Sequence, residues 1–338
     1  MKDFRKSDLY LIVYSNCIPV KGAVRSTICD LQNHRYYYIP NDLFDLLSKL
    51  KKKPLHNIYR SFSKENYGIL DEYFDFLMTN ELAFLDSQPE LFPDLNRDWS
   101  YPGQVSNAII DLNKRSISKI DYSMVIDELS NLNCECLQIR SFEGLTINDI
   151  NKILLLTTDT RLNELRLVLY YSYDVEEIVE NFILKNKRIT EVIFHGCDRT
   201  LKRDIFGVPV IFTGNVLTAK DCGQVCLQNF SVNIKHFTES LKFNSCLNRK
   251  ISIDEYGLIK NCPSSNKSYG SIKEKTLTEV LMNQEFKKLW KIKKDDVEVC
   301  KDCEYRYICT DCRVFTKGKD SYGKPEKCTY DPYEAQWN

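Results

Sequence analysis

The sequence lacks the features of membrane-spanning and nucleic-acid-coating proteins. None of its apolar runs approaches the ~20 residues that a transmembrane helix needs. Its first residues, MKDFRKSDLYLIVYSNCIPV, show no secretion signal with a cleavage site. Its 47 Lys and Arg residues balance 47 Asp and Glu residues, so no net positive charge attracts nucleic acid. We therefore expect a cytoplasmic protein that binds neither membranes nor nucleic acid.

Common catalytic motifs are missing as well. The chain contains no phosphate-binding GxxxxGK[ST], no GxGxxG, no GxSxG and no HExxH. Its four histidines are scattered, and only His195 ends a predicted strand, where barrel enzymes place functional groups. The sequence therefore leaves the catalytic residues unknown.

The first 90 residues predict three strands followed by three helices. The predicted strands are short β-branched or aromatic runs, and the helices follow from apolar periodicity. The strands are 10–14, 24–31 and 36–39, and the helices are 42–50, 58–62 and 67–84. Pro89, Pro93, Pro102 and Gly103 then predict a linker.

From Asn107 onward, strands alternate with helices, which indicates βαβ units and a parallel sheet. The predicted strands are 107–112, 136–140, 164–170, 190–195 and 208–213. This segment is shorter than the ~250 residues of a complete eight-unit barrel. We expect an α/β protein with a half-barrel or a small open sheet.

Cysteine is the residue type that the chain has in excess. Nine of its 14 cysteines fall between Cys222 and Cys328, which in a reducing compartment indicates metal binding more than disulfides. Cys17, Cys29, Cys134, Cys136 and Cys197 lie outside this segment, and we interpret them as core residues.

The crowded cysteines form two ordered groups. One group is Cys246-x10-Gly257-x4-Cys262, in which the glycine allows a tight hairpin. The other is Cys300-x2-Cys303-x5-Cys309-x2-Cys312-x15-Cys328, and a looser Cys222-x3-Cys226 pair lies upstream. Seven ordered thiols and one upstream candidate are enough for two four-sulfur sites.

These cysteines resemble a SPASM domain, the module that holds two auxiliary [4Fe–4S] clusters in peptide-modifying radical SAM enzymes. The segments CLNRKISIDEYGLIKNCPS, CEYRYICTDCRVF and KPEKCTYDPYEAQW are similar to the SPASM-domain maturases of grasp-with-spasm peptide cassettes. CIPVKGAVRSTICDL and IPNDLFDLL near the N-terminus are similar too, so the likeness covers nearly the whole chain. One departure is the short Cys309-x2-Cys312 spacing, where many relatives have three intervening residues.

The resemblance implies a set of ligands and three domains. One cluster would be held by Cys300, Cys303, Cys309 and Cys328, and the other by Cys246, Cys262, Cys312 and Cys222, with Cys226 as the alternative to Cys222. The implied domains are a leader-recognition-like module (1–90), a degenerate radical-SAM-like half-barrel (104–220) and the SPASM domain (221–338).

The chain departs from the radical SAM pattern at one decisive place. Such enzymes carry C-x3-C-x2-C on the loop after the first barrel strand, whereas here AIIDL is followed by NKRSISKIDYS. The resemblance therefore implies the clusters without the radical chemistry, and whether the chain is an enzyme stays open.

The N-terminal segment resembles the RiPP recognition element, a winged-helix-like β3α3 module that captures leader peptides. A precursor peptide would add a strand beside Tyr36, Tyr37 and Tyr38. The alternative is an ordinary edge strand packed on Phe44 and Phe74.

The resemblance implies an iron–sulfur maturation protein that binds a ribosomal precursor peptide and acts with an ATP-grasp ligase. One alternative is a redox enzyme that uses the auxiliary clusters to modify the peptide. Another is a zinc-stabilised peptide-interaction module, because Cys300, Cys303, Cys309 and Cys312 alone could hold one tetrahedral ion.

Overall fold

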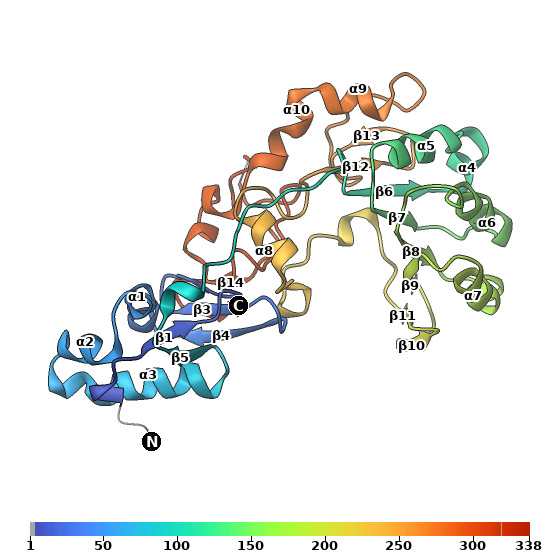
Figure 1. The fold of residues 1–338 in the computed structure, drawn as a ribbon. Helices are drawn as coiled ribbons and strands as arrows, with labels where there is room; N and C mark the ends of the chain where they lie inside the picture. The colour runs from blue at the N-terminus through green and yellow to red at the C-terminus, as the bar shows by residue number, and fades with distance from the viewer. Residues whose placement is uncertain (1–3, 319) are drawn as a thin grey trace.

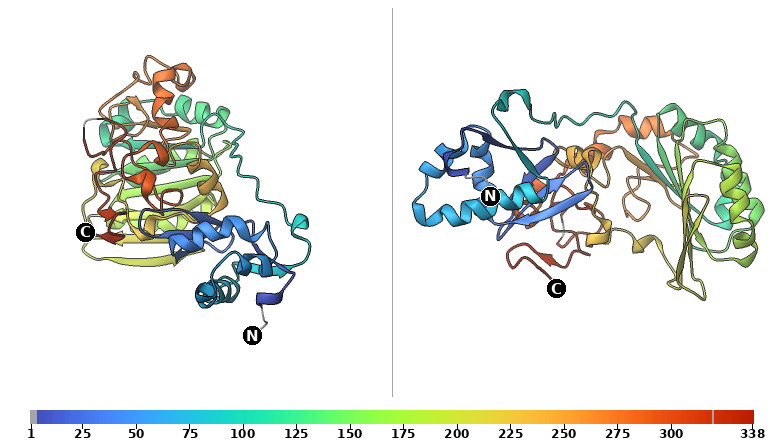
Figure 2. Two further views of the ribbon diagram at one scale, coloured as in Figure 1. Left: turned by 90° about the vertical axis from the view of Figure 1, so that its left-hand side faces the viewer. Right: turned by 60° about the horizontal axis from the view of Figure 1, so that its bottom comes forward.

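The computed structural model describes residues 4–318 and 320–338. An N-terminal module lies at one end of an elongated molecule and a large sheet at the other (Figure 1). The C-terminal third, coloured orange to red, lies between them, and an extended connection leads from the module to the sheet (Figure 2). None of the helices in the described ranges is long and apolar enough to cross a membrane.

The N-terminal module contains a three-stranded antiparallel sheet, in the order β2-β3-β4, and three helices. Its elements are β2 (Cys17–Val20), β3 (Ser26–Asp30), β4 (Arg35–Ile39), α1 (Asn41–Leu50), α2 (Leu55–Arg60) and α3 (Tyr67–Thr79). The helices pack on one face of the sheet around a core that includes Ile28, Leu46 and Phe74.

The structure departs from the prediction for this module in two places. The first predicted strand is present as β1 (Tyr10–Val13), but it pairs with β5 (Ala83–Asp86), and β2, which completes the three-stranded sheet, was not predicted. The third helix ends at Thr79, because Glu81 adopts a left-handed conformation with φ of 56° and the chain then turns into β5. Apolar periodicity continues through β5, so no local pattern indicates the turn.

The large sheet has eight strands in the order β10-β11-β9-β8-β7-β6-β12-β13 and confirms the α/β class. Its first strands are β6 (Asn107–Leu112), β7 (Cys136–Ser141), β8 (Glu164–Tyr170), β9 (Ile189–His195), β10 (Leu201–Ile205) and β11 (Val208–Thr213). Strands β6 to β9 and β11 are parallel, as the alternation predicts, and β10 pairs with β11 as an antiparallel edge.

Four helices follow these strands and cover one face of the sheet (Figure 1). They are α4 (Lys114–Lys119), α5 (Ser123–Asn131), α6 (Ile147–Leu156) and α7 (Tyr173–Lys185). Alternate strand residues, such as Ala108, Leu137 and Leu167, contribute to the core under the helices.

A hairpin from the C-terminal third extends this sheet. Strand β12 (Lys250–Ile253) pairs in parallel with β6, and β13 (Ile259–Lys260) closes the hairpin through Gly257, whose φ is 80°. The sheet is therefore open, and the predicted hairpin before Cys262 is present.

The rest of the C-terminal third is mostly loops with short helices. Its other elements are α8 (Ile234–Ser240), α9 (Leu277–Met282), α10 (Gln284–Lys287), β14 (Tyr330–Asp331) and β15 (Gln336–Trp337). These loops carry the crowded cysteines and connect the sheet to the N-terminal module.

Candidate metal centres

Four thiols from separate segments meet at the hairpin end of the large sheet. Cys222 and Cys262 share a hydrogen bond between their side chains. Cys246 lies within electrostatic range of Cys262, and Cys312 lies within range of Cys222 and Cys246. We call these four residues the first cysteine set.

The hydrogen bond within the first cysteine set shifts the pKa values of its two thiols in opposite directions. The pKa of Cys222 is lowered to about 5, with this hydrogen bond as the largest cause, and the pKa of Cys262 is raised well above its ordinary value. Metals bind the thiolate, so the lowered pKa of Cys222 favours the form that a metal needs.

A glycine allows the backbone to approach the first cysteine set closely. Gly223 has a φ of 78°, and a Cβ built there would lie 2.9 Å from the Cys312 sulfur. The backbone N–H of Phe315 donates a hydrogen bond to the same sulfur over 3.5 Å. Any larger residue at position 223 would have to displace Cys312.

Cationic side chains surround the first cysteine set. Lys250 Nζ lies 3.7 Å from the Cys246 sulfur. Arg140 and Lys327 add to the lowering of the Cys222 pKa. Arg140 is buried at the carboxyl end of β7, where Asp111 of β6 holds it through two hydrogen bonds of 2.7 and 2.8 Å.

The other four ligand candidates form the second cysteine set, which consists of Cys300, Cys303, Cys309 and Cys328. Cys300 and Cys309 each lie within electrostatic range of Cys328. Cys303 lies within range of both Cys300 and Cys309. Burial raises the pKa of Cys300, Cys303 and Cys309, the last to about 12.

A buried ammonium group opposes this effect at the second cysteine set. Lys294 is 3% exposed, and its Nζ lies 3.9 Å from the Cys300 sulfur and 3.8 Å from the Cys309 sulfur. After burial, its positive charge is the largest influence on the pKa of both thiols, and it lowers both. Asp311 Oδ1 lies 3.4 Å from the same Nζ.

The structure brings Cys222, Cys246, Cys262 and Cys312 within electrostatic range of others in that group, and likewise Cys300, Cys303, Cys309 and Cys328. Cys222 lies with the first cysteine set, whereas Cys226 lies at the start of the short turn η5 (Leu227–Asn229). Cys312 lies within electrostatic range of Cys222 and Cys246. Which of these thiols bind metal stays a prediction.

The three tyrosines predicted to bind peptide lie on β4, which pairs with β3 along one edge and with no other strand of the described ranges. Tyr37 faces α3, with its ring centroid 6.3 Å from that of Phe76. Tyr36 and Tyr38 point to the opposite face, where both pack edge-on against Tyr305. The strand is therefore an edge strand, as both interpretations of its sequence require.

His195 is buried, and two backbone hydrogen bonds hold its ring. Its Nε2 lies 3.0 Å from the Ser141 carbonyl oxygen, and its Nδ1 accepts a hydrogen bond from the Leu217 N–H over 3.2 Å. These two bonds fix the neutral tautomer that carries the proton on Nε2, and burial lowers the pKa of the ring.

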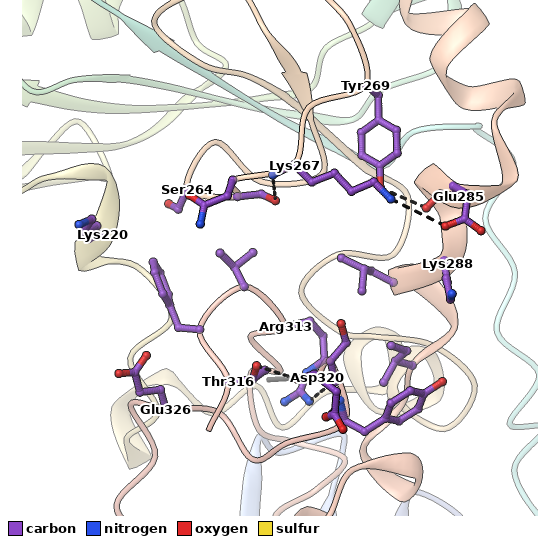
Figure 3. A pocket seen from close by; sticks show the side chains of 18 residues that line it. Lys220, Ser264, Lys267, Tyr269, Glu285, Lys288, Arg313, Thr316, Asp320 and Glu326 are labelled. Atoms are coloured by element: carbon purple, nitrogen blue, oxygen red, sulfur yellow. Dashed lines mark hydrogen bonds and ion pairs between the residues drawn. The ribbon is translucent and has the colours of Figure 1, made fainter. Parts of the chain in front are cut away.

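The structure also contains a cavity of about 1030 Å³, whose lining residues Figure 3 shows. It lies among the loops that follow Cys262 and Cys312 and the short helices around residue 288. Ser264 lines the cavity, and its hydroxyl oxygen lies 3.4 Å from the Cys222 sulfur. Lys267 and Glu285 form an ion pair at its rim.

Sequence reasoning missed the charged residues beside both cysteine sets. Asp111 and Arg140 are the only charged residues of β6 and β7, and an ionisable residue in a buried strand is the signal that could have identified them. Lys294 belongs to a lysine-rich run that reads as a solvated helix end, so its burial could not be predicted from its neighbours.

The donor atoms fit an iron–sulfur cluster in kind. Each cysteine set offers four sulfurs, with backbone N–H donors to Cys303 and Cys312 and a lysine ammonium beside it. Over residues 4–318 and 320–338, no three His, Cys, Asp or Glu side chains are arranged around a single ion. The ligands of a four-iron cluster each bind a different iron and do not meet at one point.

Comparisons with known proteins add little. No family model matches the sequence, and no curated protein matches it. Two crystal structures of SuiB from Streptococcus suis, one bound to S-adenosylmethionine, align with 94% of this chain and 97% of theirs. Their sequence identities are 12% and 11% and both TM-scores are 0.30, values too low to support an argument about this chain.

Proposed function

We propose that the chain is an iron–sulfur protein of ribosomal peptide maturation, which binds a precursor peptide and works beside an ATP-grasp ligase. The observation that supports it best is the grouping of eight thiols from distant segments into two sets of four. This grouping follows the ligand order of the SPASM domain that the sequence resembles.

Each cysteine set would hold one [4Fe–4S] cluster, which supplies one-electron transfer when bound. The protein's own residues prepare the sites. Gly223 allows the backbone to approach, Lys250 and Lys294 offset the charge of the thiolates, and burial excludes water from Cys309.

The N-terminal module, residues 1–90 in this proposal, would receive the precursor. The outer edge of β4 pairs with no other strand of the described residues, and a peptide strand can pair with such an edge. Tyr37 and Phe76 would then lie beside the added strand on the α3 side.

The loop after β6 supports maturation without radical chemistry. In place of a cysteine loop, Asn113 and Ser116 form a reciprocal capping box that starts α4. At the same end of the sheet, Arg140 and Asp111 form their buried ion pair. A redox enzyme is the second candidate, because the cavity beside the first cysteine set has room for a substrate.

Anaerobic reconstitution followed by two assays tests the proposal. Iron, sulfide and zinc are measured per chain, and the protein is then incubated with S-adenosylmethionine and a reductant. The proposal predicts about eight irons and about eight sulfides, with no cleavage of S-adenosylmethionine. Cleavage would show that the chain is a radical enzyme, and zinc without sulfide would show an interaction module instead.

A further inference from the structure

The three-stranded sheet of the N-terminal module is buried on both faces. One face packs against the helices of the module. The other face shares a core with the cysteine-rich segment, and this core includes Ile18 and Cys29 from the sheet and Ile308, Cys309 and Cys328 from the C-terminal third. The second cysteine set and the sheet therefore pack as one body.

Tyr305 connects the second cysteine set to β4 directly. Its backbone N–H donates a hydrogen bond to the Cys303 sulfur. Its ring centroid lies 5.7 Å from that of Tyr36 and 6.1 Å from that of Tyr38. Its hydroxyl also forms a 2.5 Å hydrogen bond with the Tyr38 hydroxyl. A shift of the loop at Cys303 must therefore move the side chains of β4.

Arg25 of the N-terminal module contacts both Tyr38 and Glu304, the residue before Tyr305. Its Nε donates to Glu304 Oε1 over 2.8 Å, and its guanidinium lies 3.8 Å from the centre of the Tyr38 ring. Glu304 is 1% exposed, so Arg25 offsets a buried negative charge. Thr27 of β3 donates to the Glu304 carbonyl over 3.0 Å, which adds a second bond between the sheet and this loop.

We propose that the second cysteine set and the outer edge of β4 are thermodynamically coupled through Tyr305 and Arg25. Metal at the second set orders the loop between Cys303 and Cys309, and the ordered loop holds β4 ready for an incoming peptide strand. Because coupling is reciprocal, a peptide on β4 also strengthens metal retention at this set. The inference rests on the proposed metal sites and adds a regulatory link between them and the peptide edge.

Hydrogen exchange in the full-length chain tests the coupling without a known precursor. The wild type, Cys303→Ser and Cys246→Ser proteins are reconstituted anaerobically with iron and sulfide, and exchange is followed at the amides of residues 35–39. We expect Cys303→Ser to speed exchange there about 5-fold or more. The matched control, Cys246→Ser, should lose the other site and keep the wild-type exchange rate.

A second variant distinguishes loss of the coupling from a general loss of folding. Tyr305→Phe keeps every cysteine and the packed ring, and it removes only the bonds to the hydroxyl. It should retain the wild-type iron content and still exchange the β4 amides faster than the loaded wild type does. Equal β4 exchange in Cys303→Ser, Tyr305→Phe and the loaded wild type would overturn the coupling alone. If the wild type binds no iron, the proposed function itself fails, and the coupling fails with it.

Discussion

Gly223→Ala tests whether the first cysteine set needs the close approach of the backbone at position 223. Gly223 has a φ of 78°, so an alanine there adopts a left-handed conformation that costs about 1–2 kcal/mol. Its new Cβ would also lie 2.9 Å from the Cys312 sulfur and 3.2 Å from the Cys312 Cβ. The Cys312 side chain must therefore leave its present position in the first cysteine set.

Gly207 provides a matched control for the backbone strain. Its φ is 83°, and a Cβ built there meets no heavy atom within 4 Å. Gly207→Ala should therefore lose the same ~1–2 kcal/mol of unfolding free energy without a steric clash. The turn between β10 and β11 that contains it belongs to the far edge of the large sheet from β12 and β13.

The assay is iron analysis of both variants after anaerobic reconstitution, with urea denaturation as the measure of stability. We expect Gly223→Ala to retain about half of the wild-type iron, because one of two four-iron clusters is lost. Gly207→Ala should retain all of it. Equal iron content in the two variants would refute the role assigned to Gly223.

Two further predictions concern buried charge. Asp111→Ala leaves the buried Arg140 guanidinium without its partner, so the unfolding free energy in urea should fall by about 3–5 kcal/mol; a loss below about 1 kcal/mol would contradict the ion pair. Burial raises the pKa of Glu239 to about 7 from an ordinary value of 4.5, so the folded state binds this proton more tightly and stability is lost as the pH rises from 4.5 toward 7. Glu239→Gln should therefore lose less unfolding free energy than the wild type between pH 5 and pH 8, and identical losses would show that Glu239 is not the group responsible.

The parallel part of the large sheet could be predicted because its signal is local. Each parallel strand between Asn107 and Thr213 is a short, mostly apolar run, and helical periodicity follows most of them. The strand pairs that join distant segments were harder to predict. β12 joins β6 across more than 140 residues, and β5 pairs with β1 across about 70, so their partners are set by tertiary packing.

The cysteine spacing predicted more of the candidate site than any other feature of the sequence did. Two-residue separations and the hairpin glycine predict the positions of Cys262, Cys300 and Cys303, since they act over a few residues. The contact between Arg25 and Glu304 joins residues 279 apart in the chain. No local pattern reports such a contact, so the packing of the N-terminal module on the second cysteine set could not be predicted.

Iron analysis of Cys303→Ser, Cys312→Ser and the double variant tests whether the chain holds two separate metal sites. Cys303 and Cys312 are assigned to different cysteine sets, although only eight residues separate them in the sequence. Each single variant should therefore retain about half of the wild-type iron, and the double variant should retain almost none. If the double variant loses no more metal than either single variant, Cys303 and Cys312 share one site and the two-set assignment is wrong.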